Sequence, residues 1–109
     1  MNALPIDAAP PRITAAALRR ALIAGARRVI ARRENLNRIN VFPVPDGDTG
    51  SNMAFTLGSV LSGALGRRTA STGELMARVG EVAIDGARGN SGAILAQFLQ
   101  GVAEGAHQL

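Results

Sequence analysis

The sequence predicts an all-α fold, and three observations support this expectation. Apolar residues recur at steps of three to four along most of the chain, which is the period of a helix with one buried face. No segment shows the alternation of apolar and polar residues that is typical of a half-buried strand. Capping residues and turn-forming sequences separate the periodic segments. We therefore expect four helices and one irregular loop.

The first predicted helix begins after Thr14 and ends near Arg38. The Thr14 hydroxyl can accept a hydrogen bond from a backbone N–H that the first helical turn leaves without a partner. The apolar stripe of this helix consists of Leu18, Leu22, Ala26, Val29 and Leu36. At about 100° per residue, Arg20, Arg27 and Arg28 fall on the opposite side. We interpret these arginines as a solvated helix face rather than as a nucleic-acid or membrane patch.

Two segments are predicted not to be helical. Residues 1–13 are expected to form a flexible tail, because their three prolines oppose the start of a helix. Residues 40–50 read Asn-Val-Phe-Pro-Val-Pro-Asp-Gly-Asp-Thr-Gly. In this stretch Pro43 and Pro45 remove backbone donors and favour extended geometry, and Pro-Asp-Gly is a turn signal.

Three more helices are predicted after this loop. The second helix begins within residues 49–52 and stops near Gly66. The third begins at Ser71, whose spacing to Glu74 fits a capping box. Residues 85–92, which are rich in glycine, separate it from the fourth helix. The predicted apolar side of the fourth helix consists of Ile94, Leu95, Phe98, Leu99 and Val102.

The composition limits the classes of protein to consider. The 109 residues suffice for one modest domain, and an apolar fraction of 47% can supply its core. The aromatic residues are three phenylalanines, too few for a surface on which single-stranded nucleic acid stacks. The lack of cysteine excludes disulfides and cysteine-based zinc sites. No apolar run approaches the roughly 20 residues of a membrane span, and no secretory signal pattern opens the chain. We expect a cytoplasmic protein without a nucleic-acid partner.

The irregular loop carries two carboxylates, Asp46 and Asp48, separated by one glycine. Like charges this close repel unless a cation neutralises them, and carboxylates are ligands of hard cations such as Mg²⁺. An EF-hand is excluded because Ser51 and Leu57 stand where that loop requires Gly and Glu. Mg²⁺ with phosphate fits better, because Mg²⁺ uses few carboxylates and completes its shell with phosphate and water. The alternative is that Asp48 or Thr49 merely caps the next helix.

A second polar stretch, residues 86–92, reads Gly-Ala-Arg-Gly-Asn-Ser-Gly and precedes the fourth helix. Small residues let backbone N–H groups approach an anion, and the helix N-terminus adds its positive dipole end. The Gly-Lys-Ser/Thr ending of a P-loop is absent. The alternative is an ordinary Gly-rich turn with Asn90 or Ser91 as the N-cap. Its occurrence together with the acidic loop favours a metal–phosphate site.

These motifs resemble a known family. Residues 39–53 read Ile-Asn-Val-Phe-Pro-Val-Pro-Asp-Gly-Asp-Thr-Gly-Ser-Asn-Met and are similar to the signature of the DhaL-type domain, the L subunit of dihydroxyacetone kinase, in the version of fatty acid kinases. Residues 86–92 resemble the second motif of that family, and residues 97–105 are similar as well. The resemblance implies that residues 14–109 form part of a barrel of antiparallel amphipathic helices, which binds ATP through two Mg²⁺ ions.

The resemblance also implies the residues of the site. It assigns the metal ligands to Asp46 and Asp48. A third family ligand lies slightly upstream, where the nearest candidate is Asn40, an amide rather than a carboxylate. The residues that it places near the phosphates are Thr49, Gly50, Ser51, Asn52, Gly89, Asn90, Ser91 and Gly92. No catalytic base is assigned, and His107 is interpreted as a solvated residue at a helix end.

The implied function is the Mg-ATP-binding module of a glycerone or fatty acid kinase. The module would pass the γ-phosphoryl group to a fatty acid or glycerone-like substrate that a partner protein or domain holds. Family domains are longer, so we expect a truncated domain with uncovered apolar faces, and hence self-association or missing C-terminal domains. Two alternatives stay open: a non-catalytic remnant that acts as a helical interaction module, and a helical nucleic-acid-binding protein, for which the net charge of +4 is the motive.

Overall fold

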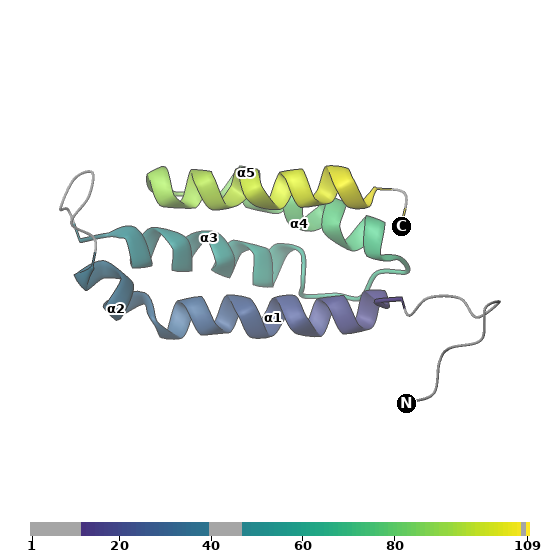
Figure 1. Cartoon of the computed structure of the whole chain (residues 1–109), viewed down its shortest axis with the longest axis horizontal. Helices are drawn as coiled ribbons and strands as arrows, with labels where there is room; N and C mark the ends of the chain where they lie inside the picture. Colours follow the sequence, from purple (N-terminus) through teal and green to yellow (C-terminus); the bar gives the residue numbers. More distant parts are fainter. Residues whose placement is uncertain (1–11, 40–46, 108) are drawn as a thin grey trace, which may run out of the picture.

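A computed structural model describes residues 12–39, 47–107 and 109, and within these residues it contains five helices and no strand (Figure 1). The helices are α1 (Ala15–Ala31), α2 (Arg33–Arg38), α3 (Thr49–Gly63), α4 (Thr72–Gly86) and α5 (Gly89–Ala106). The all-α prediction is confirmed. Of the predicted tail, residues 1–11 lie outside the described part of the chain. No helix that the structure describes has both the length and the apolar content needed to cross a membrane.

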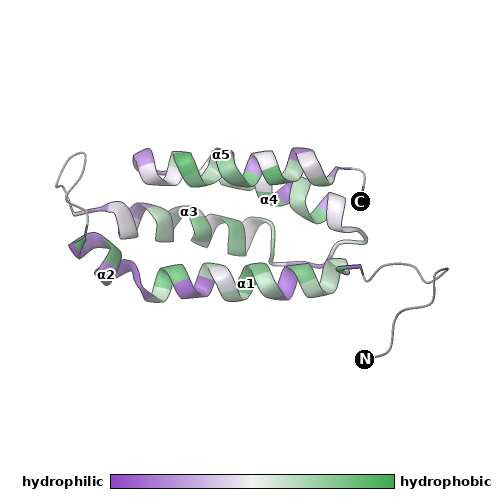
Figure 2. Cartoon of the chain, viewed as in Figure 1, coloured by the Kyte–Doolittle hydropathy of each residue, from purple (hydrophilic) through white to green (hydrophobic). Residues whose placement is uncertain are grey.

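Helix α3 is the central element, because it packs against each of the other four helices. Figure 1 shows α3 between α1 on one side and the α4–α5 pair on the other. The largest buried side chains of the core come from α3, α4, α5 and the turn after α3, and are Leu57, Val60, Leu65, Leu75, Met76, Val79 and Leu99. Figure 2 shows apolar residues along the facing sides of the helices. Each such side chain contributes about 1.5–3 kcal/mol when it leaves water.

The first predicted helix is divided in two, so the expectation of four helices is wrong. Helix α1 ends before Arg32, whose backbone has φ −101° and ψ 9°, and α2 follows at once. The Arg32 N–H still bonds to the carbonyls of Arg28 and Val29, at 3.1 and 3.0 Å. The bend brings α2 against the start of α3, where Gly50 lies so close to the Arg33 carbonyl that a Cβ would collide with it. Packing against α3 has therefore overridden a continuous helical pattern.

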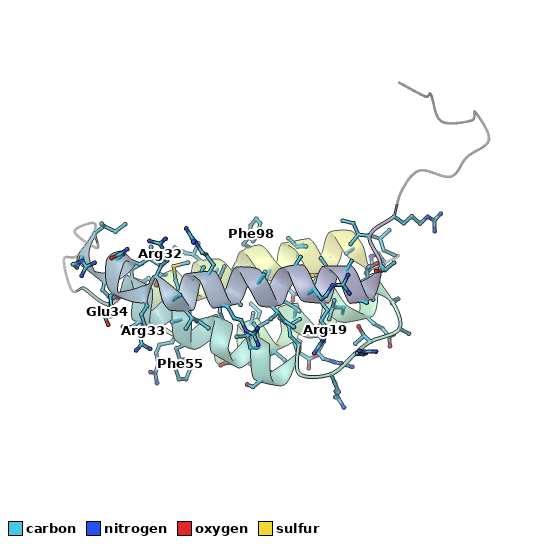
Figure 3. All side chains as sticks on the ribbon, turned by 90° about the horizontal axis from the view of Figure 1, so that it is seen from below. Arg19, Arg32, Arg33, Glu34, Phe55 and Phe98 are labelled. Atoms are coloured by element: carbon cyan, nitrogen blue, oxygen red, sulfur yellow. The ribbon has the colours of Figure 1, made fainter. Side chains whose placement is uncertain are left out.

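The predicted helix starts at Thr14 and Ser71 are confirmed. The Thr14 hydroxyl accepts the Ala17 N–H at 3.0 Å, and the Ser71 hydroxyl accepts the Glu74 N–H at 3.1 Å. The arginine face of α1 is exposed at Arg20, Arg27 and Arg28, as expected, while Leu18, Leu22 and Val29 pack against the core. An arginine outside that face has a specific role, since the Arg19 Nε donates to the Leu65 carbonyl at 2.9 Å (Figure 3).

The prediction of the apolar side of α5 is only partly correct. Leu95 and Leu99 pack in the core, but Ile94, Phe98 and Val102 are 71%, 66% and 40% exposed. Apart from Leu99, the buried residues of α5 are all small, namely Gly92, Ala96, Ala103 and Ala106. The reason is the close approach of α4, where a Cβ added to Gly80 would lie 3.1 Å from the Ala103 Cβ. Two backbones this close have room for glycine and alanine but not for larger side chains.

Candidate functional site

The two polar stretches singled out in the sequence meet at one corner of the molecule. The N-terminal ends of α3 and α5 lie at the same end of the bundle (Figure 1). The Ser91 hydroxyl in the first turn of α5 donates to the Thr49 carbonyl at the start of α3, over 3.3 Å. The two residues are 42 positions apart in the sequence. The structure therefore joins the residues that follow the acidic loop to the Gly-rich turn.

A buried threonine, which the sequence analysis missed, organises this corner. The Thr56 hydroxyl donates to the Asn52 carbonyl at 2.9 Å and accepts the Arg88 backbone N–H at 3.2 Å. Its side chain is fully buried. One hydroxyl thus satisfies a backbone donor between α4 and α5 and fixes that turn to α3. The available signal was a threonine on the apolar face of α3, one helical turn after Asn52.

Glycines let the corner close. Gly89 has φ +69°, in the left-handed region, and a Cβ on it would collide with the side-chain amide of Asn52. A Cβ on Gly92 would collide with the Thr56 hydroxyl. Both glycines belong to the predicted phosphate-contacting set, and both face side chains of α3. The predicted residues Asn52, Gly89 and Gly92 are therefore in mutual proximity.

The start of α3 is capped from outside by α2. Asn37 accepts the Ser51 N–H through Oδ1 and donates to the Ser51 hydroxyl through Nδ2, both at 2.9 Å. Asp48 occupies the N-cap position of α3, but among the described residues its side chain makes no capping hydrogen bond to that helix. Thr49 is the first helical residue. Asp48 is thus the N-cap residue by position, and the Asn37 side chain supplies hydrogen bonds to the first turn of α3.

The turn before α5 does not have the N-cap residue that the alternative interpretation of the Gly-rich stretch proposed. Arg88, not Asn90 or Ser91, occupies the N-cap position, and α5 already begins at Gly89. Asn90 and Ser91 thus lie in the first helical turn, with Asn90 exposed and Ser91 half-buried. The N-terminal ends of α3 and α5 bring two positive dipole ends to one corner. Such an arrangement is chemically suited to hold an anion.

The predicted metal ligands are only partly within the described residues. Asn40 and Asp46 fall outside them, while Asp48 is exposed immediately before α3. Within residues 12–39, 47–107 and 109, no three His, Asp or Glu side chains are grouped so that they could hold a metal ion. The donor chemistry at Asp48 and the two helix N-termini are compatible with a metal–phosphate ligand, because a hard cation prefers carboxylate oxygen and an anion is favoured at the positive end of a helix dipole.

The predicted non-catalytic residue His107 lies far from this corner along the bundle. It stands at the C-terminal end of α5, exposed, with Nδ1 3.1 Å from the Glu104 carbonyl. Helix α5 has 18 residues, which corresponds to a length of about 27 Å. His107 is therefore exposed at a helix end, as the sequence interpretation expected.

Comparison with known proteins gives the family. The model of the DAK2 domain matches residues 43–108. Relatives include uncharacterized proteins of Staphylococcus haemolyticus, 40% identical, and of Staphylococcus saprophyticus and Staphylococcus aureus, each 39% identical, over 80 residues. The match covers 73% of this chain but only 14% of the first two relatives and 15% of the third. The chain therefore belongs to the DAK2 domain family, the DhaL-type nucleotide-binding module of the dihydroxyacetone kinase family.

Proposed function

We propose that this chain is a Mg-ATP-binding module of a kinase of the dihydroxyacetone and fatty acid kinase type. The observation that carries the proposal is the junction of the two motifs, in which Ser91 bonds to Thr49 and the Arg88 N–H bonds to Thr56. Membership in the DAK2 domain family supports the nucleotide as the ligand.

Each predicted residue has a role in this proposal. Asp46 and Asp48 hold two Mg²⁺ ions, with the Asn40 amide as a further oxygen donor. When bound, the cations supply neutralisation of the charge on the β- and γ-phosphates. The phosphate-binding residues are Thr49, Gly50, Ser51 and Asn52 of α3, with Gly89, Asn90, Ser91 and Gly92 of α5.

The bonding at the corner refines two of these roles. Ser51 acts through its hydroxyl proton, because its backbone N–H and one oxygen lone pair are already engaged by Asn37. Gly89 and Gly92 act through the absence of side chains, which leaves the α5 backbone against Asn52 and Thr56. Phosphoryl transfer depends mainly on positioning and on charge stabilisation, so these residues need not exchange protons with the substrate.

The phosphoryl acceptor in this proposal is a fatty acid or a glycerone-like compound, carried by a partner protein or domain in the cytoplasm. The form of the motif at residues 39–53 supports the fatty acid kinase variety. We further propose that residues 14–109 are one part of a larger domain. The exposed side chains of Ile94, Phe98 and Val102 support a covering partner, additional C-terminal domains or self-association.

Calorimetric titration with ATP in the presence of Mg²⁺ tests the proposal. We expect the wild-type chain to bind, and Asp46→Ala and Asp48→Ala each to abolish measurable binding, because the remaining carboxylate alone cannot hold the cations. Asp85→Ala, which removes an exposed carboxylate from the end of α4, is the control and should bind as the wild type does. Binding that is the same in all four proteins would refute the metal-dependent site.

A second candidate function is favoured by the exposed face of α5. A non-catalytic helical interaction module would use this face for assembly and would bind nucleotide weakly or not at all. Phosphoryl transfer from ATP by the isolated chain, to water or to an added fatty acid, distinguishes the two. Transfer at a rate above the uncatalysed background would dismiss the non-catalytic interpretation.

A further inference from the structure

The side chain of Arg88 has no part in the motif roles given above, yet it is held in a defined position beside the corner. Its guanidinium carbon lies 3.8 Å from the centre of the Phe55 ring, which is a close cation–π contact. Both side chains are exposed, with Phe55 at 46%. In Figure 3, Phe55 projects from the lower edge of the molecule, toward the end where α2 lies.

The contact places the guanidinium over Phe55, one helical turn after the predicted phosphate-binding residues Ser51 and Asn52 of α3. Phe55 follows Ser51 by four residues and Asn52 by three, so the three side chains lie on one face of the helix. Arg88 directly precedes Gly89, which is in contact distance of Asn52. Two neighbouring residues of α3 thus hold Arg88. The Thr56 hydroxyl bonds to its backbone N–H, and the Phe55 ring stacks on its guanidinium.

The charge at this position is not explained by the fold alone. Arg88 stands at the N-cap of α5, where a cation opposes the positive end of the helix dipole. Among the described residues, no carboxylate forms a salt bridge with Arg88. Stacking on a ring occupies one face of the guanidinium and leaves its in-plane N–H groups able to donate. An anion bound in the corner would attract both the Arg88 guanidinium and the positive end of the α5 dipole, and would offset their mutual repulsion.

We propose that Arg88, held by Phe55, donates hydrogen bonds to a phosphate group of the bound nucleotide. The inference rests on the proposed function, since it deepens the same site by adding a phosphate-binding residue. Arginine suits this role because its planar fork matches phosphate oxygens in a bidentate manner, and Lys cannot reproduce that geometry. Phe55 is the positioning residue, which acts only through Arg88.

Calorimetric titration of the full chain with Mg-ATP and with Mg-tripolyphosphate tests this assignment. We expect Arg88→Gln to weaken both ligands roughly tenfold or more, the effect of one lost charge-assisted hydrogen bond. Phe55→Leu keeps apolar volume but removes the ring, and should weaken both by about two- to fivefold. Arg88→Lys should fall between the wild type and Arg88→Gln. Arg28→Gln is the control, because it removes the same charge from the exposed face of α1.

Thermal unfolding without ligand separates binding from folding. Arg88→Gln should keep the unfolding midpoint of Arg28→Gln, since the bond from the Arg88 backbone to Thr56 survives the substitution. Equal affinities of Arg88→Gln and Arg28→Gln would overturn the inference while the proposed function stands. Loss of Mg-ATP affinity without loss of tripolyphosphate affinity would overturn the phosphate assignment in favour of a base contact. A wild-type chain that binds neither ligand would overturn both the proposed function and this inference.

Discussion

At the scale of single residues, Gly89 is required for two independent reasons. Its φ of +69° is a conformation that other residues adopt only with strain, and its Cα faces the amide of Asn52 without room for a Cβ. Gly101 in the same helix is a useful contrast, because a Cβ there would meet nothing within 4 Å. The fold therefore requires glycine at position 89 but leaves room for a side chain at position 101.

We expect Gly89→Ala to lower the free energy of unfolding by about 1–3 kcal/mol, through backbone strain and the collision with Asn52. The matched change Gly101→Ala should raise it by up to about 1 kcal/mol, since alanine is the better helix former. Urea denaturation monitored by circular dichroism measures both. Equal stabilities of the two variants would show that the corner tolerates a side chain at position 89.

At the scale of elements, the short helix α2 serves as the cap of the central helix. The side chain of Asn37 takes both the backbone N–H and the hydroxyl of Ser51. A six-residue helix is too short to be stable by itself, so its position depends on this bond pair and on packing against α3. Because α3 contacts every other helix, order at its first turn affects both the core and the candidate site.

Asn37→Ala should destabilise the protein by about 1 kcal/mol, the usual effect of losing a helix cap. The control is Asn35→Ala in the same helix, whose exposed side chain contacts Arg38 rather than α3. Hydrogen exchange at the amide of Ser51, followed by NMR, should speed up only in Asn37→Ala. If the two variants exchanged alike, the capping role would be contradicted.

At the scale of the whole molecule, the bundle buries its small residues and exposes some of its large ones. Figure 3 shows Phe98 projecting from the edge opposite to Phe55. Phe98 and Ile94 keep 66% and 71% of their surface in contact with solvent, one helical turn apart on α5. Adjacent apolar side chains of this kind are typical of a surface that another chain or domain covers.

Phe98→Gln should reduce the fluorescence of a bound hydrophobic dye and lower the apparent mass seen by light scattering at high protein concentration. The free energy of unfolding should change by no more than about 0.5 kcal/mol, because most of the ring is exposed to solvent. Gln97→Ala, at the neighbouring exposed position, is the control for both measurements. Unchanged dye binding and apparent mass in Phe98→Gln would show that the exposed apolar face of α5 does not mediate association.

The sequence by itself determined the features that depend on neighbouring residues. The helical period and the hydroxyl caps at Thr14 and Ser71 follow from interactions within one turn. The two polar motifs and the family were also readable, since each motif is a continuous stretch. The metal ligands Asp46, Asp48 and Asn40 and the phosphate-binding residues stay predictions, and Asn40 and Asp46 lie outside the described residues.

Only the tertiary structure decided the features that depend on distant residues. These features are the bend at Arg32, the face that α5 buries and two hydrogen bonds. The bond between Asn37 and Ser51 joins positions 14 residues apart, and the bond between Arg88 and Thr56 joins positions 32 residues apart. Hydropathy ranks leucine and phenylalanine above alanine, but the close approach of α4 at Gly80 leaves room for only a small side chain at Ala103. Local patterns fix which residues become helical, whereas close packing of backbones fixes which side chains meet, because it depends on the shapes of both partners.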